Sequence, residues 1–151
     1  MTFFERSVRV PMVMAGLGIV PGEIANACSV VDLLPTFLDI AGQSDMKLAQ
    51  SVDGRSLLPS AQGNQEDTCE AIAEYLAEMA ADPVFMIRRG DMKYIHCDLD
   101  PPQLYDVVND PEELTNPVTD PAYATVAKSF TEEVNLRRDL SMLRGKIHTF
   151  Q

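Results

Sequence analysis

Residues 94–116 read YIHCDLDPPQLYDVVNDPEELTN, a stretch with one histidine, one cysteine and six carboxylates. These side-chain types can bind a metal ion or transfer protons. Successive residues of a strand point to opposite faces, so His96 and Cys97 cannot easily share one metal ion. His96 could share a face with Asp98 or Asp100, but zinc and iron sites need three or four ligands. The segment DLDPPQLYD also lacks the glycine of a calcium loop. We therefore predict a hairpin that continues into a third strand, and no metal site.

The rest of the chain contains no other familiar catalytic motif. It has no G-x-S-x-G turn, no phosphate-binding loop and no complete G-x-G-x-x-G. The glycine cluster from Gly16 to Gly18 lacks a third glycine, and neither His96 nor His148 lies near a motif nucleophile. From residue types and spacing alone, we predict no catalytic residue and no metal ligand in this chain.

Two charged residues stand in the apolar opening segment FFERSVRVPMVMAG. The alternation of side chains predicts a strand over residues 8–14, and Glu5 and Arg9 would lie on the same face of this segment. We interpret Glu5 and Arg9 as a structural ion pair, which would be costly to break if it is buried. The alternative is a direct role in ligand binding.

Three glutamates, Glu70, Glu74 and Glu78, recur at four-residue spacing within TCEAIAEYLAEMAAD. This segment fits either a helix or a strand. On a helix the three carboxylates would form one solvated acidic stripe. On a strand, Glu70 and Glu74 would share the face opposite Tyr75. A carboxylate close to an aromatic ring suits a quaternary ammonium ligand, so Glu74 becomes a candidate for substrate binding.

The overall composition limits the classes of partner. The chain has 151 residues and a net charge of −11, which argues against nucleic acid and anionic membranes as partners. No apolar run reaches the length of a membrane span, and no basic-then-apolar leader is present. The three cysteines, Cys28, Cys69 and Cys97, are widely spaced and odd in number, which favours reduced thiols and a cytoplasmic location.

The chain predicts an α+β fold. A small antiparallel sheet, made of residues 84–97 and 103–107, is expected to pack against a helix that begins near Asp120. A second helix over residues 32–41 is expected beside the opening strand, with Asp32 as N-cap and Gly42 as the stop.

The side-chain patterns also predict detail within these elements. In the helix over 32–41, Leu33 and Phe37, and Leu34 and Leu38, are expected on one buried face. In the last helix, the expected buried stripe is Val126, Phe130 and Val134, with Ala127 and Tyr123 beside it. Gly90-Asp91 is expected to be a two-residue hairpin turn, which sets three strand pairs. These pairs are Arg89 with Met92, Ile87 with Tyr94, and Phe85 with His96.

Four segments, taken together, resemble the sulfatase family, whose fold is similar to that of alkaline phosphatases. FFERSVRVP resembles [FY]-[FY]-E-G-[GS]-x-R-V-P, and SVVDLLPTFLDIAG resembles V-S-x-x-D-L-L-P-T-L-L-D-L-A-G. DGRSLLPSAQG resembles D-G-x-S-L-x-P-x-L-x-G, and QLYDVVNDPEELTN resembles L-Y-D-L-x-x-D-P-x-E-x-x-N-L. EYLAE and MIRRGDMKYIHCDLDPPQLYD are similar to the corresponding segments of bacterial choline sulfatases. One departure is Arg6, which stands where the family usually has glycine.

The resemblance implies hydrolysis of a sulfate ester, most specifically choline-O-sulfate. Family members use a formylglycine, made from the cysteine of C-x-P-S-R, beside a divalent metal that is usually calcium. Cys28, Cys69 and Cys97 all lack the P-S-R context, so none is expected to become the formylglycine. The chain alone is therefore expected to be inactive, with Glu74 facing the substrate ammonium group in the intact enzyme.

The resemblance also implies how the chain is divided and what it contacts. Residues 1–66 would be the end of the sulfatase α/β core, and residues 67–151 the C-terminal antiparallel sheet and helix. The expected partners are a missing N-terminal core, a small cationic sulfate ester and further copies of the enzyme. Two alternatives remain open: a stand-alone, non-catalytic module for binding or oligomerisation, and a phosphodiesterase or phosphoryl transferase of the same superfamily.

Overall fold

The computed structural model describes residues 3–49, 51–64, 69–76 and 82–137. The chain forms two compact units. The sheet unit consists of Met1–Arg9 and Ile72–Gln151, and the loop-rich unit consists of Val10–Ala71. The first nine residues lie with the C-terminal sheet, and the expected division of the sulfatase at residue 66 stays a prediction.

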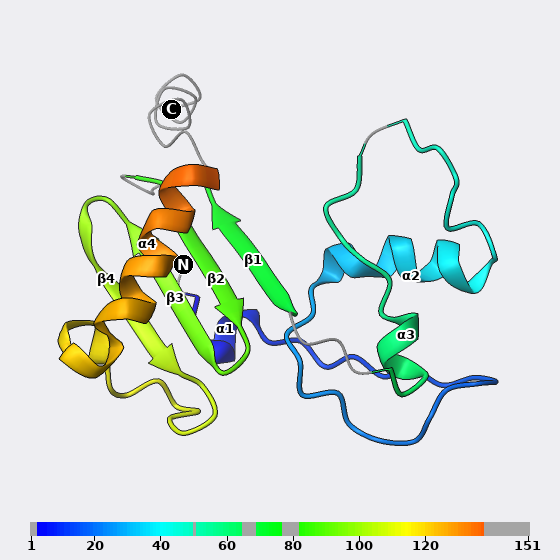
Figure 1. Ribbon diagram of the computed structural model, residues 1–151, viewed down its shortest axis with the longest axis horizontal. Helices are drawn as coiled ribbons and strands as arrows, with labels where there is room; N and C mark the ends of the chain where they lie inside the picture. The colour runs from blue at the N-terminus through cyan, green and yellow to red at the C-terminus, as the bar shows by residue number, and fades with distance from the viewer. Residues whose placement is uncertain (1–2, 50, 65–68, 77–81, 138–151) are drawn as a thin grey trace. The chain divides into compact units, whose positions relative to one another are not determined.

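The sheet unit is built on four strands in the order β1-β2-β3-β4 (Figure 1). They are β1 (Glu70–Tyr75), β2 (Val84–Arg89), β3 (Met92–Cys97) and β4 (Asp100–Asp106). Strand β3 pairs antiparallel with β2 on one side and with β4 on the other. The predicted α+β class with a small antiparallel sheet is therefore confirmed, and the ambiguous segment at residues 70–75 is a strand.

The β2–β3 hairpin has the predicted turn and register. Gly90 has a φ of +56°, a value that glycine adopts without steric cost, and it starts the two-residue turn. Arg89 lies opposite Met92, Ile87 opposite Tyr94, and Phe85 opposite His96. The register follows from local turn chemistry, which is why the sequence alone identified it.

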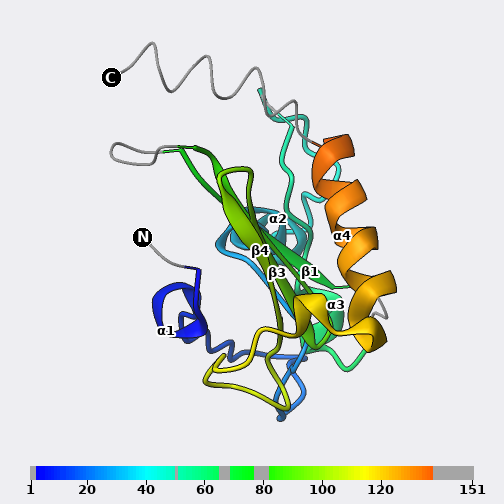
Figure 2. The same cartoon turned by 90° about the vertical axis from the view of Figure 1, so that its left-hand side faces the viewer.

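One face of the sheet is covered by helix α4 (Ala124–Arg137), as Figure 2 shows. The helix begins after a short 3-10 turn (Pro121–Tyr123), where the Asp120 side chain accepts a hydrogen bond from the Ala122 N–H. The predicted apolar stripe is wrong in one member, because Val126 is exposed, whereas Ala127, expected beside the stripe, is buried. The core on this face consists of Phe85, Ile87, Tyr94, Leu104, Ala127, Phe130 and Val134.

The opposite face of the sheet is covered by the start of the chain (Figure 2). Phe3 and Phe4 pack against a second core formed by Met86, Ile95, Tyr105 and Val107. The predicted strand over 8–14 is wrong: Glu5–Val8 forms a short helix, α1, and residues 9–15 have no regular structure. A strand needs a hydrogen-bonded neighbour, and no described segment pairs with these residues.

The loop-rich unit contains a 3-10 turn (Val30–Asp32), helix α2 (Leu33–Ile40) and helix α3 (Leu58–Ala61). Gly42 ends α2 as predicted, with a φ of +66°. The Gln43 N–H donates to the Leu38 carbonyl and the Gly42 N–H donates to the Asp39 carbonyl, the pair of bonds that closes a Schellman motif. No helix in the described residues is long and apolar enough to cross a membrane.

Asp32 is buried and connects α2 to the DGRSLLP loop. It does not cap α2 with its side chain, as the sequence predicted, but bonds to two backbone groups outside the helix. Its carboxylate accepts hydrogen bonds from the Ser29 N–H at 2.7 Å and from the Arg55 N–H at 3.0 Å. One turn further along α2, the Thr36 hydroxyl donates to the Asp32 carbonyl and accepts from the Leu57 N–H.

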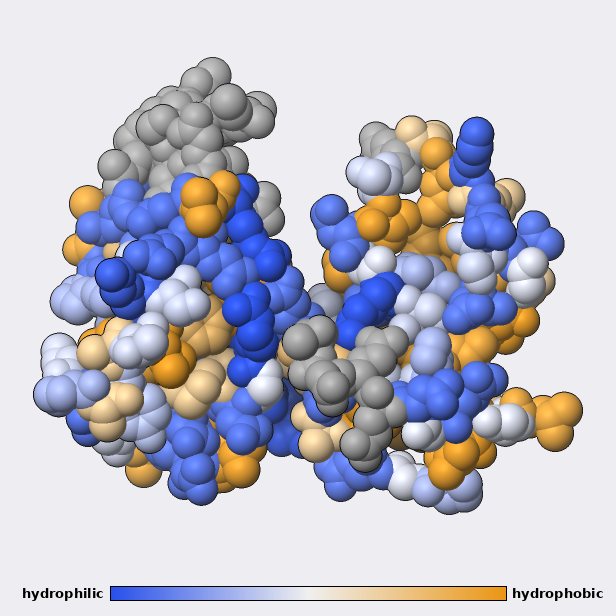
Figure 3. Space-filling view, in the orientation of Figure 1, coloured by the Kyte–Doolittle hydropathy of each residue, from blue (hydrophilic) through white to orange (hydrophobic). Residues whose placement is uncertain are grey.

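The apolar face of α2 is exposed in this chain, contrary to the prediction for Leu34 and Phe37. Leu34 is 47% exposed, Phe37 61% and Ile40 56%. Apolar residues, drawn in orange, are visible on the surface of the loop-rich unit in Figure 3. The helical spacing of these side chains was identified correctly, but the described chain provides no element that buries them.

Replacing Gly54 by alanine should destabilise the loop-rich unit. A Cβ atom at this position would lie 2.2 Å from the Val31 carbonyl oxygen, a backbone atom that cannot rotate away. We expect a loss of about 1–3 kcal/mol, the usual cost of overpacking. The measurement is amide hydrogen exchange at Arg55 and Leu57, whose N–H groups donate to Asp32 and Thr36 and should lose protection.

The matched control is Gly22→Ala, because a Cβ at Gly22 would meet no atom within 4 Å. This variant should leave exchange at Arg55 and Leu57 unchanged. Equal loss of protection in both variants would show that the close contact at Gly54 does not limit the fold.

Candidate functional site

Among the described residues of the sheet unit, the most buried charged group is the ammonium of Lys93, whose side chain is 0% exposed. Lys93 lies on β3, on the face that α1 covers. Its Nζ atom is 2.9 Å from Glu5 Oε1 and 2.5 Å from Glu113 Oε1, and it donates a 2.9 Å hydrogen bond to the Phe3 carbonyl. The lysine therefore joins the start of the chain to the turn that follows β4.

Glu113 occupies this position in an unusual backbone conformation, with a φ of +55°. Non-glycine residues adopt this left-handed region infrequently. Its N–H donates to the Asp110 carbonyl, and its Oε2 accepts the Glu5 N–H at 2.6 Å. The turn after β4 is closed by the Asp110 carboxylate, which accepts the Thr115 N–H. The DPEEL sequence thus turns one carboxylate inward and uses another to hold the loop.

The predicted ion pair between Glu5 and Arg9 is wrong in its partner. Glu5 pairs with Lys93 and, through Oε2, with Arg88 at 3.1 Å. Arg9 is exposed, and its backbone N–H donates to the Glu5 carbonyl. A buried ammonium needs a counter-charge more than an exposed guanidinium does, so Glu5 turns toward the sheet.

Arg6, which stands at the usual family glycine, fits helix α1 without strain. The non-glycine residue with positive φ among the described residues is Glu113, so Arg6 has an ordinary helical backbone. Its side chain points to solvent and forms an ion pair with Glu112. A glycine is therefore not required here by backbone geometry.

The four charges of Glu5, Arg88, Lys93 and Glu113 balance, two negative against two positive. Burial, together with the nearby carboxylates of Glu113 and Asp110, raises the pKa of the adjacent Tyr105 hydroxyl. Both carboxylates around Lys93 are already engaged, and its ammonium has no exposed surface. The cluster therefore holds the fold together and offers no room for a substrate.

The histidine and carboxylates of residues 94–116 mostly serve local structure. His96 Nε2 lies 2.9 Å from Asp98 Oδ1, and the ring stacks on Tyr94. Asp106 accepts hydrogen bonds from Asn109 and from the Val108 N–H; the Asn109 side chain is the main cause of its lowered pKa. Among the described residues, no three His, Cys, Asp or Glu side chains converge as metal ligands.

Glu74, the substrate-binding candidate, lies on β1 and is half-buried. Ile72 packs against the core beneath α4, whereas Ala73 and Tyr75 pack against the core on the α1 side. Because side chains alternate along a strand, Glu74 shares the α4 face with Ile72 and lies opposite Tyr75. Its predicted role in substrate binding stays a prediction.

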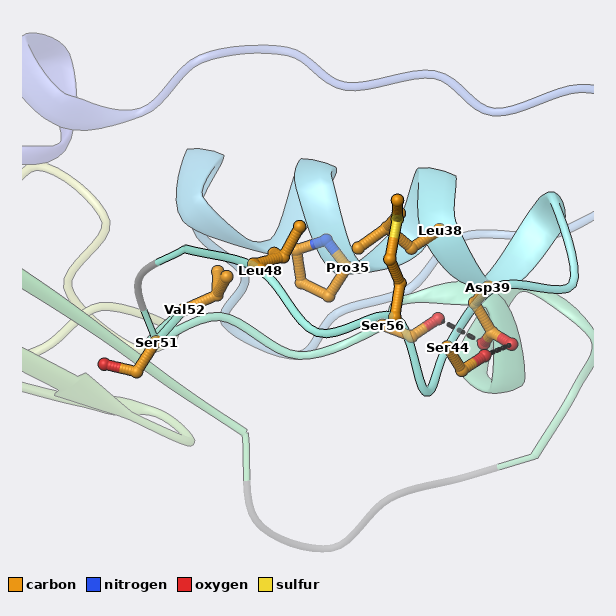
Figure 4. A pocket seen from close by; sticks show the side chains of 9 residues that line it. Pro35, Leu38, Asp39, Ser44, Leu48, Ser51, Val52 and Ser56 are labelled. Carbon is orange, nitrogen blue, oxygen red and sulfur yellow. Dashed lines mark hydrogen bonds between the residues drawn. The ribbon is translucent and has the colours of Figure 1, made fainter.

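The loop-rich unit contains a pocket of about 420 Å³ between α2 and the chain that follows it (Figure 4). Its polar side consists of Asp39, Ser44 and Ser56, which are joined by hydrogen bonds. The sequence did not indicate this site, because the spacing of its serines and aliphatic side chains matches no binding motif. It is lined by Pro35, Leu38, Asp39, Ser44, Met46, Leu48, Ser51, Val52 and Ser56.

Residues 1–139 match the family described as N-sulphoglucosamine sulphohydrolase, C-terminal. The chain therefore belongs to the sulfatases, as a C-terminal domain of that family. This confirms the family that the four sequence motifs indicated.

The chain covers different shares of three curated relatives. It is 45% identical over 121 residues to a choline-sulfatase of Rhizobium meliloti, and 34% identical over 128 residues to human arylsulfatase K. These alignments cover 80% and 77% of this chain but 23% of each relative. A third relative, an uncharacterised protein of Haemophilus influenzae, is 34% identical over 132 residues, which are 85% of this chain and 64% of that protein.

Solved structures agree on the fold. A 2-O GAG sulfatase superposes with a TM-score of 0.58 and 25% identity, over 80% of this chain and 26% of its own. A phosphonate monoester hydrolase of Agrobacterium radiobacter superposes with a TM-score of 0.56 and 26% identity, over 82% of this chain and 26% of its own. The chain thus spans about a quarter of the length of each of these structures.

Replacing Lys93 by methionine should strongly destabilise the sheet unit. The change leaves the buried carboxylates of Glu5 and Glu113 without their ammonium partner, and breaking such a pair costs about 3–5 kcal/mol. The measurement is urea unfolding followed by tyrosine fluorescence, because all four tyrosines belong to the sheet unit.

Lys128→Met removes the same charge from a side chain that is 77% exposed, and it should change stability by about 0.5 kcal/mol or less. If the two methionine variants unfolded at the same urea concentration, the buried cluster would not carry the stability assigned to it.

Proposed function

We propose that this chain is the C-terminal part of a sulfuric ester hydrolase that acts on choline-O-sulfate. The observation that supports this most directly is the 45% identity to a choline-sulfatase over 80% of the chain. The formylglycine and the divalent metal, expected to be calcium, would both belong to an N-terminal core outside this chain. Among the described residues no set of metal ligands converges, and the chain by itself is proposed to be inactive.

The role proposed for this chain is to support the core and to supply one wall of the substrate pocket. The exposed apolar face of α2, formed by Leu34, Phe37 and Ile40, is suited to packing against the missing core. Glu74 is proposed to face the substrate ammonium group, where an ionised carboxylate provides a favourable counter-charge. The Lys93 cluster would hold the opening segment, which connects to the core, on the sheet.

The proposal extends to the location of the enzyme and to its oligomeric state. We propose that the enzyme is cytoplasmic, because none of the three cysteines, all of them within the described residues, forms a disulfide. We also propose that it assembles as a homo-oligomer, which would cover part of the apolar surface that this chain exposes.

Two other functions each have one supporting observation. The Haemophilus influenzae relative, of which this chain matches 64%, favours a shorter protein; a stand-alone, non-catalytic binding or oligomerisation module is the alternative proposed on that ground. The superposition on a phosphonate monoester hydrolase favours a related reaction at phosphorus. The greater identity to the choline-sulfatase supports sulfate ester hydrolysis over both.

The first experiment is to sequence the DNA upstream of the Met1 codon. An in-frame continuation that encodes the metal-binding D-H-G and the sulfate-contacting lysine typical of sulfatases, together with C-x-P-S-R, would support a sulfatase of which this chain is the end. A stop codon followed by a promoter and a ribosome-binding site would instead support a separate small protein, and the sulfatase chemistry would be dropped for this chain.

In the complete enzyme, Glu74→Gln should raise the KM for choline-O-sulfate by about tenfold, equivalent to about 1.4 kcal/mol of binding free energy. The loss results from removing the counter-charge of the ammonium group. The KM for a neutral aryl sulfate should stay unchanged, because that substrate has no cation. Steady-state kinetics with both esters, and with a phosphonate monoester, measure this specificity.

Glu132→Gln is the matched control, since it removes a carboxylate whose side chain is 62% exposed on α4. It should leave both KM values unchanged. An equal increase in KM for the two sulfate esters in Glu74→Gln would rule out Glu74 as the ammonium contact.

A further inference from the structure

We propose that the pocket between α2 and the chain following it binds a primary alkylammonium group, with Asp39 as its counter-ion. The polar side of the pocket is a hydrogen-bonded trio. The Ser44 hydroxyl donates to Asp39 Oδ1 at 2.9 Å, and the Ser56 hydroxyl donates to Asp39 Oδ2 at 2.6 Å (Figure 4). The pocket lies wholly within the loop-rich unit.

The trio presents acceptors to a ligand. Both serine hydroxyls direct their hydrogens to the carboxylate, and Ser56 Oγ also accepts the Leu58 N–H at 3.2 Å. Hydrogen bonds from Ser56 and Ser44 lower the pKa of Asp39, so its carboxylate is ionised at neutral pH. Among the described residues, no lysine, arginine or histidine forms an ion pair with Asp39. The site therefore favours a group that brings both a positive charge and N–H donors.

The remaining walls of the pocket determine which group can be attached to the ammonium. Apart from the Ser51 hydroxyl, they are aliphatic or thioether side chains, which suit an alkyl chain and do not ligate a hard metal ion. No aromatic ring is among the lining residues, so the pocket lacks the cation–π cage that quaternary ammonium groups prefer. A primary ammonium, which can donate hydrogen bonds to Asp39, is the better match. The apolar walls are Pro35, Leu38, Met46, Leu48 and Val52.

An alkylammonium group has two natural sources, a free aliphatic amine and the side chain of a lysine in a polypeptide. The two share the chemistry that the pocket recognises and differ in the group attached to the far end of the alkyl chain. The inference does not use Glu74, the exposed face of α2 or the Lys93 cluster, to which the proposed sulfatase function assigns roles. Either can therefore fail without the other.

The test is an NMR titration of the isotopically labelled 151-residue chain at neutral pH. The probes are n-hexylamine, 1-hexanol, hexyltrimethylammonium and Nα-acetyl-lysine methylamide. We expect hexylammonium to shift the amide signals of Leu38, Asp39, Ser44 and Leu48, and to bind at least about tenfold more tightly than hexanol or the trimethyl compound. Comparable binding of the lysine derivative would assign the pocket to a polypeptide lysine; weak binding of it would assign the pocket to a free amine.

Two variants test the counter-ion. Asp39→Asn keeps the shape of the side chain but removes its charge, and it should weaken hexylammonium binding at least about tenfold. Asp45→Asn removes an exposed carboxylate outside the pocket and should change the affinity less than about twofold. Equal affinity for hexanol and hexylammonium, or no binding of any probe to the unmodified chain, would overturn the proposal whether or not Asp39→Asn folds.

Discussion

The buried ammonium of Lys93 is the constraint on which the sheet unit depends. Placing an ammonium in the protein interior costs several kcal/mol unless carboxylates and hydrogen bonds compensate. The compensation comes from Glu5 at the start of the chain and from Glu113 after β4. Helix α1, with four residues, is too short to be stable alone. It persists because Phe3 and Phe4 pack on the sheet while Glu5 meets the lysine.

In the loop-rich unit, the buried carboxylate of Asp32 joins distant segments, as the ammonium of Lys93 does in the sheet unit. One carboxylate accepts N–H groups from Ser29 and, across 23 residues, from Arg55. The absence of a side chain at Gly54 lets the two segments approach closely at Val31. The four sequence motifs thus meet in pairs: FFER contacts the DPEEL turn, and the DLLPT helix contacts the DGRSLLP loop. In each pair, a side chain of one motif forms a hydrogen bond with a backbone N–H of the other motif, which is distant in the chain.

These pairings explain what could be predicted from sequence. The β2–β3 register was correct because two adjacent residues, Gly90 and Asp91, determine it. The partner of Glu5 was wrong because Lys93 and Glu113 lie 88 and 108 residues away, beyond any local spacing rule. The strand over 8–14 was wrong because alternation indicates a preference but supplies no neighbouring strand. The Asp39 pocket was not predicted at all, since it lies between a helix and an irregular loop whose approach no local sequence pattern determines.

The two units differ in how completely they bury their apolar residues. The sheet is covered on both faces, by α4 and by the start of the chain. Helix α2 leaves Leu34, Phe37 and Ile40 about half exposed. Burial of a large aliphatic or aromatic side chain contributes about 1.5–3 kcal/mol, so covering the exposed halves of these three would contribute about 2–4 kcal/mol. A domain of about 150 residues has a total stability of roughly 5–15 kcal/mol, and this contribution is a substantial part of it. The proposed N-terminal core would therefore stabilise the loop-rich unit most, whereas the sheet unit already contains the contacts that define it.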